Sequence, residues 1–323
     1  MKELLMRIVL MIALATTQST FAAAPDVFAY KALAREDLRL STIGYRLAAA
    51  NTPFCTRKSR NPGWVLHDKA QYPDADMAQA AFGFRAAVAV SAVIPGGTAE
   101  ALGIKAGDGL SAINGIELSK LPFAQRDLAS ARLEKIQTIF GDALGSSGTA
   151  EIALVTSEGQ KRITLAPPAM CASRFWLDTK SGLDAGADGI SVRVTEGLLA
   201  FTAHDDGQLA AIVAHEMAHN LLGHRQRVSG GGKGRGQILA TEIEADRLSV
   251  WLMANAGYDT AAALRFAERY GRKTDLGIFS DGTHLRWKNR QRVMRQEIAL
   301  IAQAETSSGL RAPPLLTALE IVK

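Results

Sequence analysis

Cysteine is scarce in this chain, whose 323 residues include only Cys55 and Cys171. This scarcity argues against a disulfide-rich scaffold, and neither cysteine belongs to a metal-binding spacing. In an oxidising compartment, an even pair of cysteines is more often bridged than free. We therefore expect a Cys55–Cys171 disulfide, which would bracket the segment between the two residues.

Long hydrophobic runs are also missing. An apolar run over residues 8–15 follows two basic residues and precedes three consecutive alanines. This layout is typical of a cleavable secretory signal, and the run is too short to cross a bilayer core of about 30 Å. We expect residues 1–24 to be a signal peptide, no transmembrane segment after its removal, and a periplasmic or secreted protein.

No strong charge of either sign is present, since the formal net charge is +5 at pH 7. Basic residues are spread along the chain except in the stretch 286–295, and no aromatic residues alternate with them as nucleic-acid readout would require. The sequence therefore predicts no nucleic-acid partner, and the basic stretch is interpreted as a solvated helix face.

One apolar stretch carries a metal-binding pattern. Residues 209–221 show hydrophobic residues at helical spacing without proline, which predicts a largely buried helix. His215 and His219 lie one turn apart on it, so both imidazoles can reach one metal ion. Glu216 stands next to the first histidine, where it can act as a base toward water. A lone histidine on such a helix would be an ordinary core residue, but the complete pattern favours a zinc hydrolase.

A third ligand is expected from the next helix. A metzincin would need a histidine six residues after His219, and Arg225 stands there. Glu242 and Asp246 are four residues apart and share a helix face, whereas Glu244 points away. We predict Glu242 as the third zinc ligand and Asp246 as the partner of the outer N–H of a ligand histidine.

Residues 183–295 resemble the gluzincin metallopeptidases that include the CAAX prenyl proteases, the heat-shock peptidase HtpX and soluble periplasmic relatives. The resemblance rests on His215-Glu216-x-x-His219 with His224, on Glu242-x-Glu244-Ala245-Asp246, and on Thr283-His284 with Arg290. It implies one Zn²⁺ per chain and peptide-bond hydrolysis with Glu216 as base. It also implies catalytic roles for His284 and Arg290 near the metal.

Residues 81–168 resemble a PDZ domain. The resemblance rests on the Ala81-Phe82-Gly83-Phe84 loop, on Ala106-Gly107-Asp108, and on Asn114-Gly115. It implies that the backbone N–H groups of Phe82, Gly83 and Phe84 hold a peptide carboxylate while the peptide pairs with the following strand. A scaffold module without a ligand remains the alternative. A further strand at 189–194 is expected beside the metal helix, where it could pair with extended substrate.

Together these features predict an α+β protein, in which a mainly helical zincin domain carries an inserted or preceding PDZ-like module. The expected segments are a signal peptide (1–24), an N-terminal helical segment packed on the peptidase domain (25–80), the PDZ-like module (81–168), the zinc peptidase domain (169–305) and a loosely ordered tail (306–323). The expected function is exported endoproteolysis of proteins or peptides in envelope quality control, with C-termini as possible recognition elements. A metal-binding chaperone or a peptide-binding adaptor remain alternatives, and the oligomeric state is left open.

Overall fold

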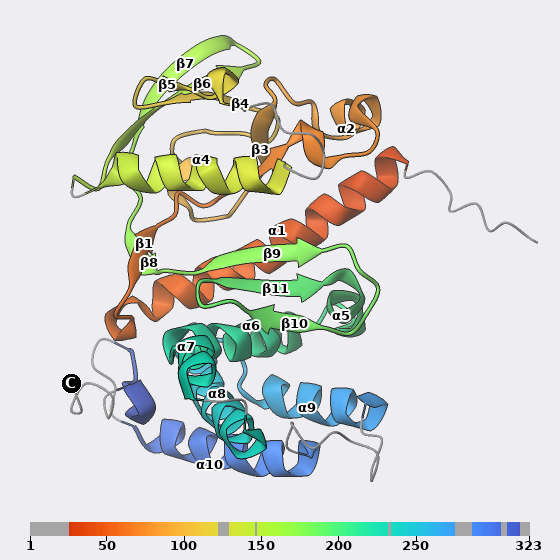
Figure 1. Cartoon of the computed structure of the whole chain (residues 1–323), viewed down its shortest axis with the longest axis vertical. Coiled ribbons are helices and arrows are strands. Elements are labelled where there is room, and N and C mark those ends of the chain that lie inside the picture. The colour runs from red at the N-terminus through yellow and green to blue at the C-terminus, as the bar shows by residue number, and fades with distance from the viewer. Residues whose placement is uncertain are drawn as a thin grey trace, which may run out of the picture.

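The computed structural model describes residues 26–121, 129–145, 147–231, 234–274, 286–304 and 309–316. The expected signal peptide and His284 lie outside these ranges. Within them the chain forms a β-rich module and a mainly helical half, with helix α1 (Val27–Ala50) running between the two (Figure 1).

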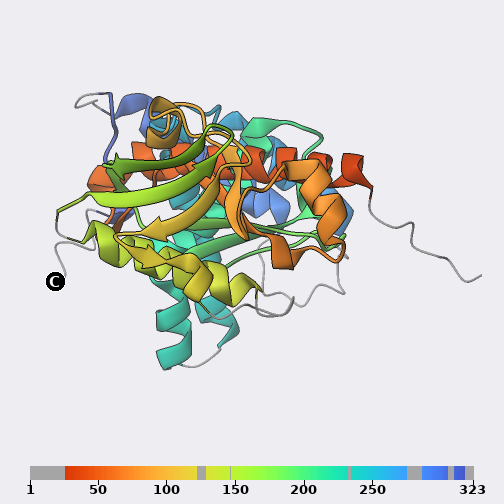
Figure 2. The same cartoon turned by 90° about the horizontal axis from the view of Figure 1, so that it is seen from above.

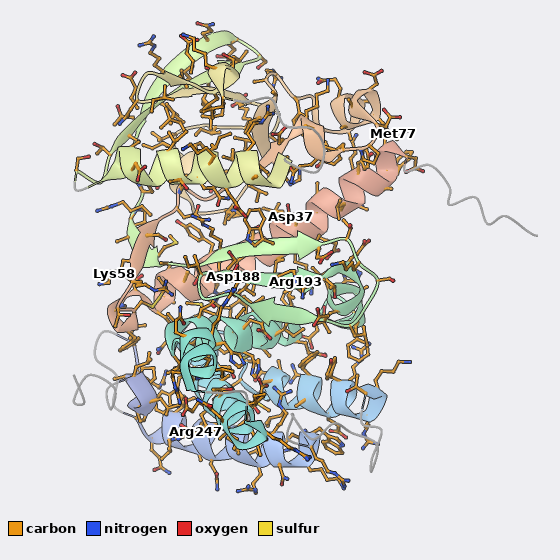
Figure 3. The ribbon with its side chains drawn as sticks, in the orientation of Figure 1. Asp37, Lys58, Met77, Asp188, Arg193 and Arg247 are labelled. Atoms are coloured by element: carbon orange, nitrogen blue, oxygen red, sulfur yellow. A yellow bond between two sulfur atoms is a disulfide. The ribbon has the colours of Figure 1, made fainter. Side chains whose placement is uncertain are left out.

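Helix α1 contacts both halves of the molecule. Near its start, Tyr30 is buried in a small cluster with Phe84 of the module. In its middle, Asp37 lies 2.8 Å from His67 of the module (Figure 3). Further on, Gly44 meets strand β9 (Arg174–Asp178) so closely that an added Cβ would lie 2.4 Å from the ring of Phe175. The N-terminal segment therefore packs on the module as well as on the helical half, to which the sequence analysis had confined it.

The β-rich module contains an antiparallel sheet of order β2-β3-β4-β6-β7, and β5 pairs with β4. Helix α4 packs on this sheet, and side chains of both elements form one buried cluster. The elements are β2 (Trp64–Asp68), α2 (Ala75–Phe82), β3 (Val88–Val93), α3 (Thr98–Ala101), β4 (Gly109–Ile113), β5 (Ile116–Glu117), α4 (Ala129–Leu144), β6 (Ala150–Thr156) and β7 (Gly159–Leu165). The sheet begins at residue 64, within the segment that the sequence analysis had assigned to the N-terminal region.

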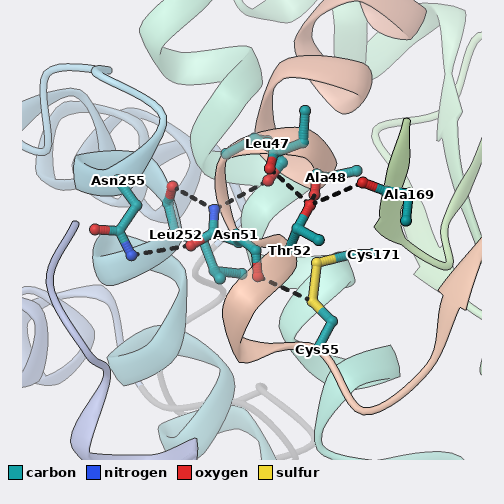
Figure 4. The surroundings of a disulfide bond; sticks show 10 residues. Leu47, Ala48, Asn51, Thr52, Cys55, Ala169, Cys171, Leu252 and Asn255 are labelled. Carbon is teal, nitrogen blue, oxygen red and sulfur yellow. Dashed lines mark hydrogen bonds between the residues drawn. A yellow bond between two sulfur atoms is a disulfide. The ribbon is translucent and has the colours of Figure 1, made fainter. Parts of the chain in front are cut away.

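A two-stranded antiparallel ribbon of β1 (Lys58–Arg60) and β8 (Ala169–Cys171) connects the module to the helical half. Beside it, Cys55 and Cys171 are joined by the predicted disulfide (Figure 4). The Asn51 side chain donates hydrogen bonds to the carbonyl groups of Leu47 and Leu252, 3.0 Å each, and so ties the end of α1 to helix α8 (Arg235–Asn255). Because α1 packs on the helical half before the module begins, the module is an insertion in that half.

The helical half is built around α6 (Asp206–Leu221), which contacts α1, α8, α9 and a three-stranded sheet. The sheet order is β10-β11-β9, with β10 antiparallel and β9 parallel to the central strand β11. The remaining elements are β10 (Ala185–Ala187), β11 (Ser191–Thr195), α5 (Glu196–Phe201), α7 (His224–Gly231), α9 (Ala261–Thr274) and α10 (Trp287–Gln303). Figure 2 shows α7 and α8 projecting from one side of the body. The separate sheets and helices are compatible with the predicted α+β class.

The described part of the tail is packed rather than loose. Arg311 N–H donates to the Asn255 side chain at 2.9 Å, and Leu315 and Leu316 pack against the main core. The sequence analysis missed this because the contacts join residues far apart in the chain. No helix among the described residues is both long and apolar enough to cross a membrane.

Candidate metal centre

Helix α6 presents the predicted histidine pair from a buried position. Asp205 caps its start by accepting hydrogen bonds from the N–H groups of Gly207 and Gln208. Most of its aliphatic residues are inaccessible to solvent, which fixes the rotation of the helix. His215 and His219 therefore point together toward α8, and their Nε2 atoms lie 3.2 Å apart.

Glu242 of α8 completes a three-residue donor set. Its carboxylate oxygens lie 3.4 Å from Nε2 of His215 and 3.4 Å from Nε2 of His219. The three donor atoms all fall within 4.8 Å of one another. Two imidazoles and a carboxylate are a common zinc donor set, and ligand atoms about 2 Å from a tetrahedral ion lie about 3.3 Å apart. The residues present thus fit one zinc ion.

Behind His215, Asp246 and Arg290 form a buried ion pair. Asp246 accepts from the outer nitrogen Nδ1 of His215 at 3.1 Å, and it is 1% exposed. Arg290 of α10 donates to the same carboxylate at 2.6 and 2.9 Å. Burial alone would raise the pKa of Asp246, but Arg290 and His215 lower it to about 2.

This geometry gives Arg290 a supporting contact in the site, and the catalytic role expected for it stays a prediction. Its guanidinium donates to Asp246 on the outer side of His215, so it supports a ligand histidine, and it also lines the cavity that contains Glu216. The resemblance could place Arg290 near the metal but could not give its direction, which depends on how α10 packs. His284, its expected companion, lies outside the described residues.

Behind His219 is a second chain of contacts that the sequence analysis did not predict. His224 Nδ1 lies 2.8 Å from His219 Nδ1, and His224 Nε2 lies 3.0 Å from a Glu244 oxygen. Glu244 in turn accepts from Arg227 at 2.6 and 3.2 Å. Glu244 does point away from the metal position, as predicted, yet it reaches a metal ligand through His224. The spacing of His224 after His219 was the only available signal.

The two ligand histidines differ in their affinity for protons. Burial alone would lower the pKa of His215, but its hydrogen bonds to Asp246 and Glu242 outweigh burial and raise the pKa to about 10. Burial, with the charge on His215, lowers the pKa of His219 to about 3. Two imidazoles this close are not both charged, so in the metal-free pair the extra proton and its positive charge are on His215, while His219 is neutral. A metal ion must displace that proton.

Glu216 lies beside the histidines in a cavity of about 820 Å³. Burial, together with the nearby charge of Glu242, raises its pKa, while the charges of His215 and Arg290 act in the opposite direction. On the cavity's other walls are β10, α9 and α10, which contribute Ala185, Ala187, Phe266, Tyr270 and Trp287. A carboxylate of raised pKa next to a metal position is suited to accept and return a proton.

The strand expected to pair with substrate lies in the middle of its sheet. Residues 191–195 form the central strand β11, which has a neighbour on both edges. The two outer strands of this sheet are β10 and β9, and of these β10 contributes Ala185 and Ala187 to the lining of the cavity. The sequence analysis located the sheet beside the metal helix but missed β10, because a three-residue strand leaves little pattern.

The expected carboxylate-binding loop also differs in the structure. Phe82 is the last residue of α2, and Gly83 N–H donates to the Gln79 carbonyl at 2.8 Å, which caps the helix. Phe84 is buried, and β3 downstream is flanked by β2 and β4. These residues therefore provide no free nest of N–H groups, because they form the end of helix α2. They also provide no open strand edge, because β2 and β4 pair with β3.

Residues 179–235 match a protein-family model that is described as Peptidase family M48. No curated protein matches the chain. The matched segment includes the helix that carries His215, Glu216 and His219, and it ends at the start of α8, before Glu242. The match supports the resemblance drawn from the sequence: a segment of the chain, with the helix of the candidate zinc site, is similar to the M48 peptidases.

Proposed function

We propose that the protein is a zinc-dependent endopeptidase that hydrolyses peptide bonds in extended segments of proteins. The observation that carries this proposal is the convergence of His215, His219 and Glu242 in the cavity that also holds Glu216. A zinc ion bound there would lower the pKa of a water molecule toward about 7 and polarise the substrate carbonyl.

The residues of the chain supply the proton transfers. Glu216 accepts a proton as water oxygen bonds to the carbonyl carbon, and returns it to nitrogen as the carbon–nitrogen bond breaks. Asp246 holds His215 from behind, so the imidazole keeps its orientation during turnover. Tyr270 lies on the opposite wall, where its hydroxyl donates to the carbonyl of Leu183 at 3.3 Å, two residues before β10 begins.

Substrate would bind as an additional strand on β10. The small residues Ala185 and Ala187 leave room beside the cavity, and backbone pairing recognises an extended chain without requiring either chain end. A folded protein cannot offer such a strand unless it opens locally. This favours unfolded or partly unfolded proteins as substrates, in agreement with a role in protein quality control.

The location and the module belong to the same proposal. The buried disulfide and the signal-like start of the sequence support export to the periplasm or beyond. Among the described strands of the module's sheet, β2 and β7 are the outer ones, and α4 packs near β2. If the module recognises peptides or C-termini as a PDZ domain does, the peptide would add to β2, not to the strand after Phe84.

The test is cleavage of an unfolded protein by purified, zinc-loaded enzyme. We expect internal cleavage, seen by mass spectrometry as new N- and C-termini, which stops on chelation and returns with one equivalent of zinc. Removal of single residues from a chain end would contradict the endopeptidase assignment, and no cleavage by fully zinc-loaded protein would favour the chaperone or adaptor alternative.

A further inference from the structure

The two histidines of the metal centre are supported in different ways. The outer nitrogen of His215, Nδ1, contacts the carboxylate of Asp246 directly. The outer nitrogen of His219, Nδ1, instead reaches a carboxylate through a second imidazole, that of His224, which contacts Glu244. A ligand imidazole normally needs a partner for its outer nitrogen, because this contact fixes both its tautomer and its ring orientation.

We propose that His224 is a positioning residue which, with Glu244, holds His219 in the tautomer and orientation that bind the metal. This inference rests on the proposed zinc site. To bind metal through Nε2, His219 must carry its proton on Nδ1. That N–H donates to Nδ1 of His224 across 2.8 Å, so Nδ1 of His224 must be unprotonated.

The proton of His224 is then on Nε2, where it donates to Glu244 across 3.0 Å. Each contact in the chain has one proton, and each imidazole is neutral. The ionised carboxylate at the end therefore determines the direction of both hydrogen bonds. Arg227 holds that carboxylate with two contacts, at 2.6 and 3.2 Å.

The local structure is built for this contact. His224 is the first residue of α7 and is 3% exposed. The chain leaves α6 through Gly223, whose φ of +64° lies in the left-handed region that favours glycine. This turn brings the His224 ring back against His219, with ring centres 4.8 Å apart. Both ring nitrogens of the buried His224 have hydrogen-bond partners, which an apolar side chain of similar size could not provide.

The first experiment compares His224→Leu with His224→Gln by zinc competition against a chelator at fixed pH. Leucine fills the space but offers neither acceptor nor donor, so the zinc dissociation constant should rise about 10- to 100-fold. The glutamine amide can accept from His219 and donate to Glu244, so the constant should return to within about threefold of wild type. Equal weakening in both variants, or none in His224→Leu, would overturn the inference.

A second measurement needs no variant and therefore does not depend on variant folding. In zinc-loaded wild-type protein with ¹⁵N-labelled histidine, long-range ¹H–¹⁵N spectra should show His224 protonated on Nε2 only. Protonation on Nδ1, or on both nitrogens, would contradict the proposed chain. Failure of wild-type protein to bind zinc at all would refute the proposed function, which keeps the two failures distinct.

Discussion

Glu242 and Glu244 are two residues apart on α8, so their side chains lie on different faces of the helix. Glu242 reaches both ligand histidines, whereas Glu244 reaches His224 and Arg227. Helical periodicity alone was sufficient to predict this difference, as it was for His215 and His219. It could not predict the partners of Arg290 or His224, because these depend on how α10 and the turn into α7 pack against α6.

At this scale the ligand set can be tested by substitution. Glu242→Ala removes a donor atom, so we expect most zinc to be lost on dialysis. Asp246→Ala should weaken zinc binding by about 10- to 100-fold, because His215 loses the partner of its outer nitrogen. Metal content by mass spectrometry measures both, with the exposed Glu158→Ala as a control. Retention of full zinc content by Glu242→Ala would show that another residue is the third ligand.

Zinc affinity should also depend on pH in a defined direction. In the metal-free protein the pKa of His215 is raised to about 10, so this residue is protonated at any lower pH. Zinc binding then releases that proton, and affinity should rise about tenfold for each unit of pH increase until the pH approaches that pKa. Competition titrations between pH 6 and about 8 would check this slope. An affinity independent of pH would indicate that His215 is already neutral.

Among the elements, α6 positions the outer strand as well as the metal ligands. Asn220, directly after His219 and 3% exposed, accepts from Gly189 N–H at 2.6 Å and donates to the Ser191 carbonyl at 3.0 Å. Gly189 lies in the turn between β10 and β11, and Ser191 is the first residue of β11. One side chain thus joins the metal helix to the connection between β11 and the proposed substrate strand β10.

Replacing Asn220 with alanine should leave both backbone groups without their partner. We expect a loss of about 2 kcal/mol in the free energy of unfolding, which is the order of magnitude for buried polar groups left unpaired. We also expect a raised KM for extended substrates with a nearly unchanged kcat, because β10 would lose its fixed position while Glu216 keeps its own. Denaturant unfolding and steady-state kinetics measure these effects, with exposed Asn289→Ala as the matched control. An unaltered KM in a destabilised variant would exclude the link to substrate binding.

Secondary-structure elements were predicted best where the pattern of residues within a single segment identified the element. The metal helix, expected over residues 209–221, is observed as α6 (Asp206–Leu221). Strands β2 and β10 were missed because both are short and are stabilised by pairing with other parts of the chain. Missing β2 also misplaced the open edge of the module's sheet.

In the whole molecule, an inserted module is held to the helical half by α1, the β1–β8 ribbon and the disulfide. The pairing of Cys55 with Cys171 could be predicted, since the chain has no other cysteines. That the module is inserted could not be predicted, because it depends on contacts of α1 with helices that come much later in the chain.

The disulfide should make a large contribution to stability. It closes a loop across a sequence separation of 116 residues, for which loop entropy gives about 4 to 5 kcal/mol as an upper bound. We expect the double variant Cys55→Ala, Cys171→Ala to unfold at clearly lower denaturant concentration than the oxidised wild type. A non-reducing peptide map of exported protein should show the bridge. Two free thiols in that map would contradict the structure.

The central claim is that Glu216 acts as the base of a zinc site formed by His215, His219 and Glu242. The most direct measurement compares wild-type protein with Glu216→Gln on the same unfolded substrate, at equal and verified zinc content. Because general base catalysis contributes about 10²- to 10⁴-fold, kcat/KM should fall by at least about 100-fold while zinc remains bound. Cleavage by the zinc-loaded variant at the wild-type rate would contradict this account.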